Sequence, residues 1–61
     1  MPLVTVKALQ GRTAEQKRGL VKDITEAVVK NFKADPDSVI VDILEYSKEN
    51  FAKAGKLFVD R

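Results

Sequence analysis

The chain has 61 residues, 44% of them hydrophobic, and a formal net charge of +2. It contains no cysteine and no histidine, which excludes disulfides, thiol or imidazole chemistry and the usual zinc sites. Its length allows a single domain, residues 1–61, and so short a chain buries only about 60% of the surface that it exposes when unfolded. Domains of this size without disulfides or metals are normally stabilised by self-association, so we expect a homo-oligomer.

The charge pattern argues against a nucleic-acid partner, and the hydropathy pattern argues against a membrane. Eleven basic and nine acidic residues are interspersed, whereas a nucleic-acid surface concentrates its basic residues in a patch or stripe. No stretch is long and apolar enough to span a membrane, and the first residues lack the pattern of a signal peptide. We therefore expect no nucleic acid and no membrane as a partner, and a cytoplasmic location.

The first element predicted is a strand over residues 3–9. Val4, Val6 and Ala8 recur at alternate positions, which is the period of a half-buried strand. Pro2 suits the residue before such a strand, because its missing N–H breaks no central ladder bond. Pro2 therefore has two interpretations. It blunts a sheet edge, or, if Met1 is removed, it presents a secondary amine that can act as a base.

A helix is predicted after the turn at residues 10–12. Thr13 and Gln16 have the spacing of a capping box, which satisfies two backbone donors at a helix start. The helix should run from Ala14 to Phe32 or Lys33, because Pro36 in the segment that follows disfavours helical geometry at the residue before it. Its predicted apolar stripe consists of Leu20, Val21, Ile24, Ala27, Val28 and Phe32.

A second strand is predicted over residues 39–46, which are rich in β-branched side chains. Strand, helix and strand in this order predict an α/β (α+β) fold, a single βαβ unit with a parallel strand pair. One helix leaves one sheet face and both edges uncovered, so we expect assembly into larger sheets. In the tail, residues 57–59 favour a short strand, and Phe51 is either a core anchor or the wall of a ligand pocket.

Several residues together resemble the 4-oxalocrotonate tautomerase family. They are Pro2 behind the initiator methionine, the turn Leu9-Gln10-Gly11-Arg12-Thr13, the run Glu15-Gln16-Lys17, and Phe51 in the tail. The resemblance covers essentially the whole chain. It implies a homohexamer built as a trimer of dimers. It also implies an isomerase of aromatic compound catabolism that needs no cofactor and interconverts enol and keto forms of 2-hydroxy-dienoate and 2-oxo acid substrates.

The resemblance also implies roles for three residues. Pro2 would be the general base after removal of Met1, Arg12 would bind the substrate carboxylate, and Phe51 would line an apolar pocket. An ordinary α-amino group is mostly protonated at neutral pH. Burial and a nearby positive charge both lower the pKa of such an amine, which is the direction that a general base needs.

One position departs from the family pattern. A second arginine, which polarises the 2-oxo group in the best-known members, aligns with Ile40, which is apolar. Lys7, Lys48 and Lys53 are candidates to replace it. The departure keeps two alternatives open: a hydratase or dehalogenase relative that uses the same proline, and a non-catalytic oligomeric interaction module.

Overall fold

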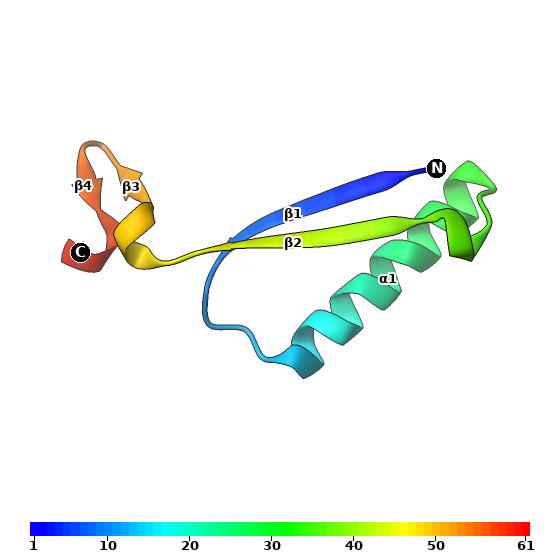
Figure 1. The fold of residues 1–61 in the computed structure, drawn as a ribbon, viewed down its shortest axis with the longest axis horizontal. Coiled ribbons are helices and arrows are strands. Elements are labelled where there is room, and N and C mark those ends of the chain that lie inside the picture. The colour runs from blue at the N-terminus through cyan, green and yellow to red at the C-terminus, as the bar shows by residue number, and fades with distance from the viewer.

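The computed structural model describes all 61 residues and contains one βαβ unit followed by a small hairpin (Figure 1). The unit consists of β1 (Leu3–Leu9), α1 (Ala14–Phe32) and β2 (Ile40–Tyr46). The strands β1 and β2 pair in parallel, with Leu3 opposite Ile40 and Leu9 opposite Tyr46. The predicted βαβ unit with its parallel strand pair is therefore confirmed.

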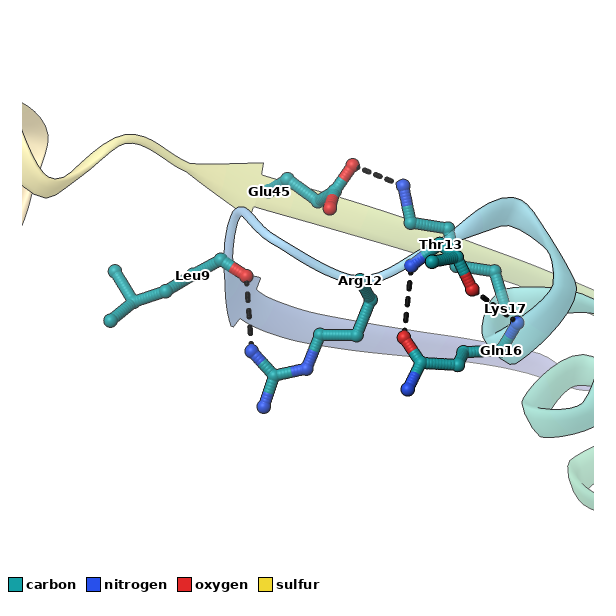
Figure 2. A network of polar contacts seen from close by, with 6 residues as sticks. All are labelled: Leu9, Arg12, Thr13, Gln16, Lys17 and Glu45. Atoms are coloured by element: carbon teal, nitrogen blue, oxygen red, sulfur yellow. Dashed lines mark hydrogen bonds and ion pairs between the residues drawn. The ribbon is translucent and has the colours of Figure 1, made fainter.

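Both ends of α1 follow from local sequence. The amide of Gln16 donates to the hydroxyl of Thr13 at 3.1 Å, and the amide of Thr13 donates to the side-chain oxygen of Gln16 at 2.9 Å (Figure 2). The predicted capping box is thus present. The helix ends at Phe32, and Lys33 follows in the left-handed conformation with φ of 55°. None of the helices in the structure combines the length and hydropathy needed to cross a membrane.

The helix covers one face of the two-stranded sheet. Lys17 of α1 forms an ion pair with Glu45 of β2, so Glu45 points toward the helix. Because strand side chains alternate, the neighbours of Glu45 point to the other face. The half-buried apolar residues of this layer are Val4, Val6, Ala8, Val41 and Ile43 from the strands and Val21, Ile24, Val28 and Val29 from α1.

The apolar stripe predicted for α1 is correct only in part. Val21, Ile24 and Val28 are half-buried, whereas Leu20, Ala27 and Phe32 stay exposed, with 71% of the Phe32 surface accessible. The sheet has only two strands and is too narrow to cover the whole apolar side of the helix. Leu20 and Phe32 flank the strip that this narrow sheet can reach.

The tail differs from its prediction. A 3₁₀ turn, Lys48–Asn50, leads into a hairpin of β3 (Ala52–Lys53) and β4 (Lys56–Leu57), which is followed by a second 3₁₀ turn, Phe58–Asp60. Of the strand predicted over residues 57–59, only Leu57 lies in a strand, and the prediction is wrong for Phe58 and Val59. The amide of Phe58 donates to the carbonyl of Phe51 at 2.8 Å, which closes the hairpin and turns the chain out of the extended conformation.

The isolated chain has no buried core. No residue is fully buried, and Leu3, Ile40 and Leu44 on the uncovered sheet face are 70%, 44% and 45% exposed. The radius of gyration is 14.8 Å, whereas a compact domain of this length is expected to have about 10.5 Å. The hairpin also stands away from the sheet (Figure 1). These features are those of a unit that packs against other chains.

The capping box should contribute measurably to stability. Thr13→Ala removes the hydroxyl that accepts from Gln16, which should lower the free energy of unfolding by about 1 kcal/mol. Thr13→Ser retains the hydroxyl and is the matched control. Urea denaturation at a fixed protein concentration measures both variants. Equal losses for alanine and serine would show that the capping hydrogen bond contributes nothing.

The uncovered sheet face should hold the assembly together. Leu44→Lys places a charge on this face, so the mass from sedimentation equilibrium should fall toward that of a single chain. Lys22→Ala, on the exposed side of α1, is the control and should leave the mass unchanged. A wild-type protein that sediments as a single chain, or a Leu44→Lys variant with wild-type mass, would contradict this expectation.

Candidate active site

A concave surface of about 400 Å³ lies at the carboxyl end of the paired strands. Leu9 and Tyr46, which face each other at the last step of the β1–β2 pairing, form its floor. Lys7 and Ala8 extend it along β1, and Phe51 closes it from the tail. Four of these five lining residues are hydrophobic, so Lys7 provides the only charge. No group of three or more acidic side chains is placed to hold a metal ion.

Phe51 both anchors the hairpin and lines the concave surface. Its ring lies edge-on to Phe58 with centroids 4.9 Å apart, and it is tilted against Tyr46 at 6.0 Å. The guanidinium carbon of Arg61 lies 5.2 Å from the centroid of the Phe58 ring. Edge-to-face aromatic pairs at these distances are favourable beyond their buried area. Phe51 thus packs against the other aromatic rings of the tail and lines the concave surface, and its role toward a ligand stays a prediction.

Arg12 lies in the loop between β1 and α1 and contacts Leu9, one of the residues that line this surface. Gly11 precedes it with φ of 130°, a backbone conformation that residues other than glycine rarely adopt. The guanidinium of Arg12 donates a long hydrogen bond, 3.5 Å, to the carbonyl of Leu9 (Figure 2). Arg12 has no carboxylate partner, because the two ion pairs of the structure join Lys17 to Glu45 and Arg18 to Glu15. Its charge is therefore free to bind an anion.

Pro2 lies at the opposite end of β1. It is half-buried, and its carbonyl accepts from the amide of Ile40 at 3.0 Å. The strand between Pro2 and Leu9 spans about 23 Å at 3.3 Å per residue. One chain therefore brings Arg12 and Phe51 to the same end of the sheet but leaves Pro2 at the other. With Met1 attached, the Pro2 nitrogen is part of a peptide bond and has no basic lone pair.

Three lining residues, Ala8, Leu9 and Tyr46, did not emerge from the sequence as site residues. The pattern that could have found Tyr46 is its alternation with Glu45, which places it on the face away from the helix once the parallel register is known. Of the three lysines considered for a second cation, Lys7 lines the concave surface, whereas Lys48 and Lys53 do not.

Residues 2–61 match the family model described as tautomerase enzyme. The chain therefore belongs to the tautomerase family, which is a family of isomerases. The match begins at Pro2, the residue that becomes N-terminal when Met1 is removed.

Individual relatives support the same family. The chain is 50% identical over 60 residues to 2-hydroxymuconate tautomerase of Bacillus subtilis, covering 98% of this chain and 97% of the relative. It superposes with a TM-score of 0.91 and 48% identity on the crystal structure of YwhB, a homologue of 4-oxalocrotonate tautomerase, covering 98% of both chains. A heterohexameric 4-oxalocrotonate tautomerase from Chloroflexus aurantiacus has 25% identity and a TM-score of 0.87, with 98% and 97% covered.

Proposed function

We propose that this protein is an enol–keto tautomerase of 2-hydroxy-dienoate and 2-oxo acid substrates, with the amine of Pro2 as general base after removal of Met1. The observation that carries the proposal is the family match, which begins at Pro2 and extends to the last residue. A 50% identical relative named 2-hydroxymuconate tautomerase supports this substrate class.

The reaction requires only a proton transfer. The lone pair of the Pro2 nitrogen takes the proton of the 2-hydroxyl group, the O–H bond breaks and the C=O bond forms. The conjugated double bonds shift, and the same proton is delivered to a substrate carbon as a C–H bond forms. No electrons leave the substrate, so the reaction needs no redox cofactor. Arg12 would hold the carboxylate, since a guanidinium can bind both carboxylate oxygens at once.

The distance between Pro2 and Arg12 supports a site shared between chains. A general base must lie within about 3 Å of the proton that it takes. Pro2 would therefore have to reach the substrate that Arg12 holds, but within one chain the length of β1 separates the two residues. We therefore propose that Pro2 of one chain meets Arg12 and Phe51 of another in a homo-oligomer, with a hexamer as the expected size. Phe51 would exclude water, which lowers the pKa of the amine below that of an ordinary α-amino group.

The free amine of Pro2 should be essential for turnover. Retention of Met1 converts this nitrogen into an amide, so kcat with 2-hydroxymuconate or phenylenolpyruvate should fall by about 10²–10⁴-fold, the usual contribution of a general base. Intact mass identifies the matured and unmatured chains, and sedimentation confirms that both assemble. Equal rates for the two forms, or turnover of halogenated acrylates without turnover of enols, would overturn the proposed reaction.

A mixing experiment tests the shared site. Pro2→Ala and Arg12→Gln chains should each be nearly inactive alone. When they are unfolded together and reassembled, sites that join Pro2 of the Arg12→Gln chain to Arg12 of the Pro2→Ala chain are intact. Activity per chain should therefore recover to a measurable fraction of wild type. A mixture as inactive as its components, with mixed oligomers verified by mass spectrometry, would show that each site belongs to one chain.

A further inference from the structure

We infer that Lys7 of one chain forms an ion pair with Asp42 of a second copy across the uncovered sheet face, and that this pair determines which chains assemble with one another. The inference rests on the expected self-association of the chain. It does not depend on the reaction that the assembled protein catalyses.

The uncovered sheet face carries one cation and one anion. Glu45 points toward α1 and lies opposite Ala8, so the alternate residues Lys7 and Asp42 point away from the helix. A second chain that covers this face therefore encloses both charges in a mostly apolar contact. The other residues of the face are uncharged: Leu3, Thr5, Leu9, Ile40, Leu44 and Tyr46.

The chain itself pairs neither charge with an opposite one. Its two ion pairs join other residues, and the Oδ1 atom of Asp42 accepts a hydrogen bond from the hydroxyl of Thr5 at 2.7 Å. This bond holds the carboxylate and leaves its second oxygen to accept from another donor. A charge that is buried without an opposite charge is strongly destabilising. A contact between chains that covers Lys7 and Asp42 must therefore bring an opposite charge to each of them.

A second copy of the chain brings both opposite charges at once. Lys7 lies opposite Leu44 and Asp42 lies opposite Thr5, so the two charges are two positions apart on neighbouring strands. In a contact between identical faces related by a two-fold axis, a residue that meets another is met by it in return. If Lys7 meets Asp42 of the copy, Asp42 also meets Lys7 of the copy. The face is therefore complementary to itself.

An ion pair within one chain is the alternative to this contact. Lys7 and Asp42 are diagonal neighbours on one sheet face, and such neighbours lie within reach of a long side chain. An internal pair would make the face neutral without any preference among partners. Mixtures of chains with reversed charges distinguish the two arrangements, because only a pair between chains responds to the identity of the partner.

Single charge reversals should weaken assembly. Lys7→Glu brings two negative groups together across the contact, and Asp42→Lys brings two positive groups together. Each should raise the dissociation constant of the oligomer about a hundredfold or more, measured by sedimentation equilibrium over a range of protein concentrations. A wild-type protein that sediments as a single chain, or single variants that assemble as tightly as the wild type, would overturn the inference.

A mixture of the two single variants tests whether the pair joins different chains. Isotopically labelled Lys7→Glu and unlabelled Asp42→Lys are unfolded together and reassembled, and native mass spectrometry counts the mixed oligomers. A contact between the two variants restores both opposite-charge pairs, so the ratio of mixed to unmixed oligomers should exceed that of random mixing about tenfold or more. Lys22→Glu and Asp23→Lys make the same charge changes on the exposed side of α1 and should mix at random. Random mixing of the first pair would reject the contact.

A second mixture excludes an effect of net charge. The double variant Lys7→Glu/Asp42→Lys has the net charge of the wild type, because its two changes cancel. In a contact between double variant and wild type, like charges meet twice, so mixed oligomers should fall about tenfold or more below random mixing. Random mixing here would also reject the contact. Where the double variant does not assemble, the mixture of single variants decides.

These experiments measure mass, so they separate this inference from the proposed function. The expected preferences in a protein that turns over no enol would contradict the tautomerase proposal and retain the contact. Turnover of enols by oligomers that mix at random would contradict the contact and retain the tautomerase.

Discussion

The parallel pairing of β1 with β2 is the constraint on which the rest of the structure depends. A shift of this pairing by one residue would turn every side chain of a strand to the opposite face. In the observed register Glu45 meets Lys17 of α1, while Lys7, Leu9 and Tyr46 face away from the helix. The single ion pair between sheet and helix and the lining of the concave surface are thus two consequences of the same register.

Assembly and chemistry are coupled in this chain. Because no residue is fully buried, the free energy that holds the protein together must come largely from contacts between chains. The proposed catalytic pair has the same requirement, since Pro2 and Arg12 lie at opposite ends of β1. In this proposal the apolar sheet face serves stability and site formation at once. A substitution on this face can reduce activity without touching any residue that contacts substrate.

The elements governed by local sequence could be predicted, and those governed by distant contacts could not. The capping box at Thr13 and the alternation of β1 gave correct boundaries, because both depend on neighbouring residues. The tail depends on Phe58 reaching back to Phe51, which no local pattern contains. The roles expected of Pro2, Arg12 and Phe51 stay predictions, although the seven residues of β1 already imply that Pro2 and Arg12 of one chain cannot meet.

The separation of base and cation has a consequence for how the amine could be tuned. Within one chain, neither Arg12 nor Phe51 is near enough to affect the Pro2 nitrogen, because the two ends of β1 lie about 23 Å apart and charges in water are screened over about 10 Å. Only a neighbouring chain can supply the positive charge and the apolar wall that lower the pKa of the amine. A dissociated chain would therefore keep an ordinary, mostly protonated amine. In this proposal the interface between chains does more than position the base, because it also creates the base.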